Sequence, residues 1–284
     1  MQTKALLLFG FKKNPFVNSI KDKRLFHRTQ KYNETLLRMH EGIKEPNTDI
    51  TMIYGEIGVG KSYTSAILNS ELDEMGYYMV YMPNSYENFE ILLCSIVRNI
   101  TSESPTNITE ATLYFEELLE KVEEEENQLV IILDECHTYS METLDKIRQL
   151  SNYNAKSDMK LLSLVLVGQT ELMNTVKKMP QLYSRIKVKQ YLEPLKEHEI
   201  LDYIEFKIRT VGYTERENPF KDHIREIYEA TKGMHRLINN VCEAAIDIAA
   251  DENTTIITKE IMVKGIEEIL RRQELYITGG SNNE

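Results

Sequence analysis

Short, nearly continuous apolar runs alternate along the first two thirds of the chain with segments that have the apolar spacing of helices. The runs cover residues 49–54, 77–82, 128–135 and 161–168. Helical spacing covers residues 25–43, 63–72, 88–100, 108–125 and 140–153, with Ser140 as a candidate N-cap. Unbroken apolar runs are typical of strands in parallel sheets that are covered on both faces. The pattern therefore predicts a three-layer α/β fold with right-handed crossovers.

The strand pattern stops after Leu192, and the chain changes character near Pro194. Apolar spacing beyond this point predicts helices over residues 198–210, 223–231, 236–250 and 258–274. We therefore expect an α/β core over 1–194, a small helical domain over 195–274 and a disordered polar tail over 275–284. At the other end, Gly10 and Pro15 punctuate an aromatic-rich segment, which favours an ordered arm attached to the core.

The loop between the first predicted strand and its helix carries the strongest chemical signal. Residues 55–62 read Gly-Glu-Ile-Gly-Val-Gly-Lys-Ser and fit the P-loop pattern G-x-x-x-x-G-K-[ST]. Glycines allow successive backbone N–H groups to face one phosphate, and the following helix adds its positive end. We expect Lys61 to reach the β- and γ-phosphates of ATP and Ser62 to place its hydroxyl on Mg²⁺. The predicted nucleotide contacts are Gly55, Glu56, Ile57, Gly58, Val59, Gly60, Lys61, Ser62 and Tyr63.

Two acids end the third predicted strand, where the carboxyl ends of parallel strands meet the P-loop. At that edge Asp134 is expected to hold Mg²⁺, directly or through water, and Glu135 to orient the attacking water. The alternative is an acidic turn where a strand reaches solvent. His137 follows the pair, but no second ligand at metal-binding spacing accompanies it.

Further polar residues are weaker candidates for catalysis. Gln169 and Thr170 follow the fourth predicted strand and are candidates for contact with the γ-phosphate or the water, Gln169 being preferred; the alternative is a capped turn. Arg185 is a candidate to stabilise the transition state in a neighbouring subunit, and otherwise a surface arginine. Arg236 begins a helix of the small domain and is a candidate to swing onto the phosphates when that domain closes.

Composition narrows the class of protein. The chain has 284 residues, of which 42% are hydrophobic and 28% charged, as in ordinary globular proteins. No apolar run approaches the roughly 18–20 residues that span a bilayer, and three scattered cysteines favour reduced thiols, so we predict a cytoplasmic protein. A net charge of −11 argues against a general nucleic-acid coat but leaves room for a local basic surface.

The order of these motifs resembles that of AAA+ ATPases. The Walker A and Walker B segments, Gly168-Gln169, Arg185 and Gly233-Met234-His235-Arg236 come in that order. The chain is more narrowly similar to the ExeA-like branch, through Gly10-Phe11, Asn14-Pro15-Phe16, Val167-Gly168-Gln169 and residues 192–195. The resemblance implies a P-loop core with a helical lid, and adenine contacts from Asn14, Pro15 and Phe16. The sequence Asp134-Glu135-Cys136-His137 departs from the usual wording of that branch, which leaves the role of His137 open.

Two kinds of protein occur in that branch. One is a secretion ATPase that continues into a membrane helix. The other is a transposon ATPase, similar to TnsC- and MuB-type regulators, that oligomerises on duplex DNA and recruits or activates a transposase. Because this chain ends soon after the lid, the resemblance favours a transposition regulator; a secretion or envelope-assembly ATPase and a slowly hydrolysing scaffold remain alternatives. Candidate DNA-backbone contacts are Lys146, Arg148, Lys156 and Lys160.

Overall fold

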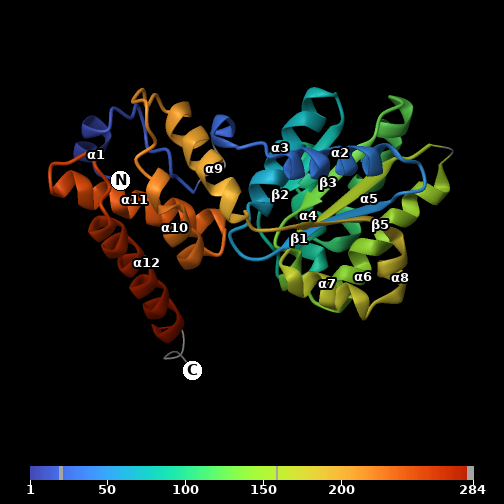
Figure 1. Ribbon diagram of the computed structural model, residues 1–284. Coiled ribbons are helices and arrows are strands. Elements are labelled where there is room, and N and C mark those ends of the chain that lie inside the picture. The colour runs from blue at the N-terminus through green and yellow to red at the C-terminus, as the bar shows by residue number, and fades with distance from the viewer. Residues whose placement is uncertain (19–21, 158, 280–284) are drawn as a thin grey trace. The chain divides into compact units, whose positions relative to one another are not determined.

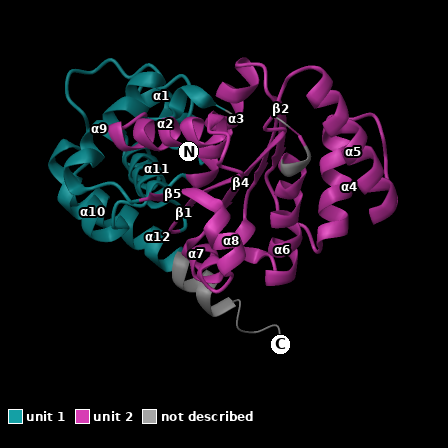
Figure 2. Cartoon of the chain, turned by 90° about the vertical axis from the view of Figure 1, so that its right-hand side faces the viewer, with its two compact units in different colours: residues 1–27, 57–60, 193–284 teal, residues 28–56, 61–192 magenta. Residues whose placement is uncertain are grey.

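The computed structural model describes residues 1–18, 22–157 and 159–279, with the backbone alone for residues 155, 156 and 273–279 (Figure 1). The chain divides into two compact units, coloured separately in Figure 2. Unit 1 comprises Met1–His27, Ile57–Gly60 and Glu193–Glu284, and unit 2 comprises Arg28–Glu56 and Lys61–Leu192. Within the described residues, no helix combines the length and the hydropathy needed to cross a bilayer.

Unit 2 is built on a five-stranded parallel sheet. Its strands are β1 (Ile50–Gly55), β2 (Tyr78–Met82), β3 (Leu129–Leu133), β4 (Leu162–Gly168) and β5 (Ile186–Leu192), in the order β2-β3-β4-β1-β5. All residues of β3 and β4 are buried, as their apolar sequences require. The four predicted strands and the three-layer α/β class are confirmed.

Helices cover both faces of this sheet. They are α2 (Gln30–Lys44), α3 (Lys61–Glu74), α4 (Phe89–Ile100), α5 (Ile108–Glu124), α6 (Met141–Leu150), α7 (Thr170–Lys177) and α8 (Pro180–Arg185). Figure 1 shows α2 and α3 on one face and α6, α7 and α8 on the other. Ser140 caps α6 as predicted, since its side chain accepts a hydrogen bond from the N–H of Thr143. Helix α2 begins at Gln30, later than predicted, because the Thr29 side chain caps it.

The fifth strand, β5, was missed by the sequence analysis. Its residues Ile-Lys-Val-Lys-Gln-Tyr-Leu place lysines among apolar side chains, unlike the continuous runs of the central strands. As an edge strand it pairs with β1 alone, and exposed lysines are a common protection of such edges. The alternation of apolar residues and lysines at its start was the signal in the sequence that could have indicated a strand.

Unit 1 is helical and includes the N-terminal arm. Its helices are α1 (Thr3–Leu8), α9 (Glu197–Thr210), α10 (Ile224–Thr231), α11 (His235–Asp251) and α12 (Lys259–Gly279). Phe9, Phe11 and Phe16 are buried in the same core as α9 and α11. The arm therefore belongs to the helical unit, because its aromatic side chains are buried in that unit's core. We had predicted it as part of the α/β core. The boundary near Pro194 falls between Leu192 and Glu193.

The end of the chain also differs from the expectation. Helix α12 continues through Gly279, whereas we predicted a disordered tail from residue 275. The last five residues of that predicted tail, 280–284, lie outside the described residues.

One glycine fixes the turn between α10 and α11. Lys232 and Gly233 are both left-handed, with φ of 50° and 76°. A Cβ at Gly233 would lie 1.8 Å from the carbonyl oxygen of Leu195, whose own N–H donates to the carbonyl of Gly233 at 2.9 Å. Only glycine fits there, so this turn is pinned to the first residues after the unit boundary.

Candidate nucleotide-binding site

The P-loop connects β1 to α3, as the sequence predicts. Gly58 and Gly60 have φ of 83° and 93°, a conformation that favours glycine. Lys61 is 8% exposed, and its Nζ donates to the carbonyl oxygens of Gly55 at 2.9 Å and Glu56 at 2.8 Å. The ammonium group therefore lies at the base of the loop. It can exchange its two carbonyl acceptors for phosphate oxygens when a nucleotide binds.

The tip of the loop, Ile57–Gly60, belongs to unit 1 and contacts α11. The backbone N–H of Arg236 donates to the carbonyl of Gly58 at 3.2 Å. A Cβ at Gly58 would lie 3.1 Å from the Cβ of Arg236, so the approach is close. Arg236 thus contacts the P-loop tip with its backbone, while its side chain is exposed.

Asp134 follows β3 directly and is 2% exposed. Its Oδ1 accepts the N–H of Glu135 at 2.8 Å, and the Ser62 hydroxyl also bonds its side chain. Burial raises the pKa of Asp134 above its ordinary value, while these hydrogen bonds and the Lys61 charge lower it. The structure brings together the two predicted metal ligands, Ser62 and Asp134, which share a hydrogen bond.

This donor set fits Mg²⁺. Hydroxyl and carboxylate oxygens are ligands that Mg²⁺ prefers, and with ATP it takes one or two protein ligands plus phosphate oxygens and water. Among the residues that the structure describes, no three His, Cys, Asp or Glu side chains are placed to hold a metal by themselves. The site therefore suits a nucleotide-bound cation, whose chemistry is to bridge and neutralise phosphate oxygens.

Glu135 has a strained backbone. Its φ of 57° and ψ of 27° are left-handed, which is uncommon for a residue with a side chain. The side chain is 43% exposed, and its Oε2 lies 3.4 Å from Nδ1 of His137. Strain of this kind gathers at functional sites, and here it falls on the residue that directly follows the buried Asp134.

A residue that the sequence analysis missed lies beside Asp134. The Tyr81 hydroxyl on β2 donates to Oδ2 of Asp134 at 3.4 Å. Burial raises the pKa of Tyr81 to about 12, so the phenol keeps its proton at any physiological pH. The available signal was its position at the end of a strand next to β3, which only the strand order reveals.

Gln169 lies between β4 and α7. It takes the N-cap position of α7 without a capping side-chain bond, and it is half-buried. Thr170 is already the first residue of the helix, and its Oγ1 lies 3.4 Å from Oε2 of Glu171. Gly168, just before, is packed closely: a Cβ there would lie 3.0 Å from the backbone nitrogen of His137. The Gln169 side chain is thus left available at the carboxyl edge of the sheet.

Arg185 lies at the opposite edge of the same sheet. Its Nη1 donates to Oγ of Ser151 at 2.6 Å and lies 3.5 Å from Oδ2 of Asp49. Ile186, the next residue, pairs with Ile50 at the amino end of β1, whereas the P-loop leaves the carboxyl end. At about 3.3 Å per residue these ends are roughly 17 Å apart, farther than an arginine side chain extends.

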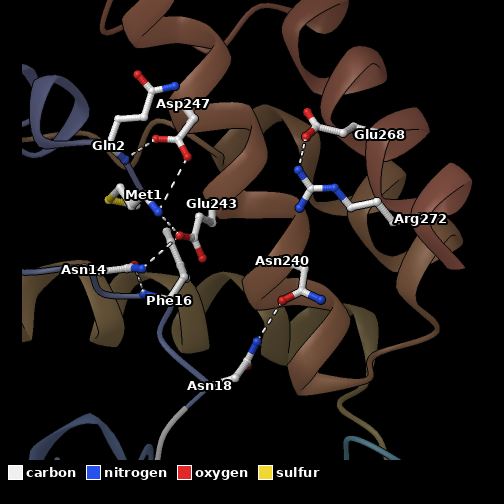
Figure 3. Close-up of polar contacts among 10 residues, drawn as sticks. All are labelled: Met1, Gln2, Asn14, Phe16, Asn18, Asn240, Glu243, Asp247, Glu268 and Arg272. Atoms are coloured by element: carbon white, nitrogen blue, oxygen red, sulfur yellow. Dashed lines mark hydrogen bonds and ion pairs between the residues drawn. The ribbon is translucent and has the colours of Figure 1, made fainter. Parts of the chain in front are cut away.

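The N-terminal box is held inside unit 1, as Figure 3 shows. Asn14 Nδ2 donates to Oε1 of Glu243 at 3.0 Å, and Asn14 Oδ1 accepts the N–H of Phe16. Pro15 is buried, and the fully buried Phe16 ring meets Phe220 edge-on at 6.0 Å. These contacts account for the box as an anchor of the arm; its predicted role at the adenine stays a prediction.

The candidate DNA contacts differ in how exposed their side chains are and in whether these side chains already donate hydrogen bonds within the protein. Lys160 Nζ donates to the carbonyls of Gly42, Ile43 and Glu45, which caps the C-terminal end of α2. Arg148 Nε donates to Oδ1 of Asp145 at 2.8 Å, and its side chain is 12% exposed. Lys146 is exposed, and the side chain of Lys156 lies outside the described residues.

With this geometry in view, comparison with known proteins identifies the core. The family model described as AAA domain matches residues 45–176, which contain the P-loop, the acidic pair and Gln169. The matched residues take in β1 to β4 and most of α7, that is, most of the α/β core.

The proteins that match most of this chain have low sequence identity to it. General secretion pathway protein A of Aeromonas hydrophila is 25% identical over 243 residues; the match takes in 84% of this chain but only 43% of that protein. Cdc6p from Pyrobaculum aerophilum has a TM-score of 0.70 at 18% identity, over 89% of this chain and 70% of that one. ORC1 of Aeropyrum pernix, solved in complex with DNA, has a TM-score of 0.66 at 16% identity, over 95% and 71%. At these identities the two structures support the fold alone.

Proposed function

We propose that the protein is an ATP-dependent regulator of DNA transposition that assembles on duplex DNA and recruits or activates a transposase. The observation that carries the assembly step is the placement of Arg185. It lies at the amino edge of the sheet, about 17 Å along β1 from the P-loop, so it can reach only the phosphates bound by another copy. A complete ATPase site then requires two neighbouring copies, and ATP couples them.

Within one copy, we assign the remaining roles as follows, with support from the positions described above. Ser62 and Asp134 hold Mg²⁺, and Lys61 moves from the loop carbonyls to the phosphates. Glu135 orients the attacking water from its exposed position, and Gln169 contacts the γ-phosphate or that water. Arg236, placed at the P-loop tip, contacts the phosphates when the helical unit closes.

Duplex DNA is the proposed surface on which the copies assemble. ORC1, one of the proteins with this fold, was solved in complex with DNA, and the sequence motifs resemble those of transposon ATPases. Contacts to phosphates, without base readout, give weak sequence preference and strong salt dependence. Lys146 is the exposed candidate for such a contact.

One observation favours a second candidate function. The relative from Aeromonas hydrophila is named General secretion pathway protein A, and this chain matches 43% of it. An ATPase for secretion or envelope assembly would use the same nucleotide site and act on protein partners. The two candidates differ in whether the ATP state binds DNA.

Binding to a random-sequence duplex, with ATP, ADP or no nucleotide across a salt series, separates the candidates. We expect assemblies that form with ATP alone, weaken steeply with salt and change little between DNA sequences. Lys146→Glu should weaken binding for all sequences alike, and Glu142→Lys, on the same helix, is the matched control. Intact ATP hydrolysis without DNA binding in any nucleotide state would contradict the transposition proposal and favour the secretion candidate.

A further inference from the structure

Four residues form a closed ring of polar contacts inside unit 2. The Ser65 hydroxyl donates to the carbonyl oxygen of Ser62 at 3.1 Å and lies 3.4 Å from the hydroxyl of Tyr81. Tyr81 donates to Oδ2 of Asp134 at 3.4 Å, and the Ser62 hydroxyl bonds Asp134 in turn. The ring joins the first turns of α3 to β2 and to the end of β3. Both proposed metal ligands, Ser62 and Asp134, are members.

Tyr81 is placed by the sheet. In the parallel register of β2 and β3, Tyr81 pairs with Ile132 and Met82 with Leu133. The N–H of Asp134 then donates to the carbonyl of Met82 at 2.9 Å, which ties the backbone of the aspartate to β2. The Tyr81 side chain therefore reaches Asp134 from a strand that is itself fixed to it.

The two oxygens of Asp134 have different donors. Oδ1 accepts the backbone N–H of Glu135, while Oδ2 accepts the Tyr81 hydroxyl. Ser65 is fully buried and Asp134 nearly so, so water cannot readily replace a lost donor there. A phenylalanine would fill the same space between α3 and β2, but it would leave Oδ2 without the phenol, so the carboxylate would be oriented by the Glu135 N–H and Ser62 alone.

We propose that Tyr81 is a positioning residue for the Mg²⁺ site, whose hydroxyl fixes the orientation of the Asp134 carboxylate. Outer hydrogen bonds of this kind orient ligating carboxylates and tune metal affinity. Tyr81 does not touch the nucleotide; it acts through Asp134. The inference rests on the Mg²⁺–ATP site of the proposed function but not on DNA or on transposition.

Tyr81→Phe tests this role, with Tyr78→Phe as the matched control. Tyr78 is on the same strand, but its hydroxyl donates to Glu125 at 2.6 Å at the other end of β2. In Tyr81→Phe we expect the Mg²⁺ concentration for half-maximal ATP hydrolysis to rise about 10-fold, the lower end for outer-shell changes. Binding of a fluorescent ATP analogue in EDTA should stay unchanged, because the P-loop contacts are intact. Tyr78→Phe should match the wild type in both measurements.

Ser65→Ala provides a second, independent test. It removes the contact that links Tyr81 to α3 but keeps the Tyr81–Asp134 bond, so the Mg²⁺ requirement should rise by a smaller factor, roughly 3-fold. Equal Mg²⁺ requirements in wild type, Tyr81→Phe and Ser65→Ala would overturn the role of Tyr81 alone. An equal loss of binding in EDTA would also overturn it, since a merely structural effect is not confined to Mg²⁺. A wild-type protein that binds no ATP would instead contradict the proposed function itself.

Discussion

The two edges of the same parallel sheet are built in opposite ways. At the amino edge, polar groups that precede the strands are paired. Lys160 donates to three carbonyls at the end of α2. Asn154 bonds Asp49, which precedes β1, and both backbone groups of Leu162, the first residue of β4. Arg185 joins this network through Ser151.

The carboxyl edge combines unfavourable features. Asp134 is a buried carboxylate whose pKa is raised by burial, Glu135 is left-handed, and the P-loop needs glycines with positive φ. Proteins accept such strain where a ligand or a reaction needs it. We infer that the contacts at the amino edge stabilise the fold of one copy. The unfavourable features of the carboxyl edge are those that we assign to nucleotide binding. Arg185 is the exception, since we assign it a role beyond its own edge.

Two lysines, the buried Lys61 and the half-buried Lys160, one at each edge, offer the largest contrast. Lys61→Ala should lower ATP affinity more than 100-fold, because its charge serves the phosphates. Lys160→Met should leave ATP affinity unchanged but lower the free energy of unfolding by about 1 kcal/mol, because three carbonyls lose a donor while those of Ile43 and Glu45 keep another one. Fluorescent-nucleotide binding and urea denaturation measure the two effects. Normal ATP affinity in Lys61→Ala would refute the P-loop assignment.

Glu135→Gln changes the chemistry of the carboxyl edge alone. We expect ATP to stay bound while hydrolysis slows by about 10²–10³-fold, because the amide cannot accept a proton from the water. Glu142→Gln, an acid in the first turn of α6, is the control and should hydrolyse ATP at the wild-type rate. Single-turnover assays separate hydrolysis from binding. Hydrolysis by Glu135→Gln at the wild-type rate would show that another residue orients the water.

Asp134→Asn should stabilise the nucleotide-free protein while it weakens Mg²⁺-dependent hydrolysis. Because burial raises the pKa of Asp134 in the folded protein, this carboxyl group ionises at a lower pH in the unfolded chain. The ionised Asp134 therefore lowers the free energy of unfolding at pH values above the ordinary carboxyl range. Removal of the charge should add about 1 kcal/mol, or roughly 3 °C in melting temperature at pH 7.

Asp145→Asn is the opposite case for that comparison. The Arg148 hydrogen bond holds the pKa of Asp145 below its ordinary value, so its charge stabilises the fold above that pH range and the effect is lost as the pH falls. The carboxyl group is 39% exposed, so its loss should give a small decrease in melting temperature or none. An Asp134→Asn protein that melts below both the wild type and Asp145→Asn at pH 7 would show that the carboxyl edge is not strained.

Sequence patterns predicted the central strands, the P-loop and the acidic pair because their signals are local. A buried strand is continuous in apolar residues, and Gly55 to Ser62 form one contiguous motif. The edge strand β5 escaped because its lysines break that pattern. Tyr81 escaped because its relation to Asp134 depends on β2 lying beside β3, a pairing between distant segments.

Other residues have a chemistry that fits more than one role. Lys160 is a candidate DNA contact, and its position before β4 directs its Nζ to the carbonyls of α2. Phe16 is a candidate adenine contact, and the core of unit 1 encloses its ring, so its role at the adenine stays a prediction. In both cases the residue type fits either role, and the sequence does not show the tertiary contacts. Arg185 keeps its predicted role in a neighbouring copy, which awaits a test.

The central claim, that the carboxyl edge of one copy and Arg185 of another make one ATPase site, is tested by mixing two inactive variants. Arg185→Ala and Glu135→Gln should each hydrolyse ATP poorly alone. In an equal mixture, about one quarter of the contacts between copies should pair an intact Glu135 with an intact Arg185, and hydrolysis should return in proportion. Ser151→Ala, which removes a partner of Arg185 within its own copy, should remain active. A mixture as inactive as either variant alone would contradict the shared site.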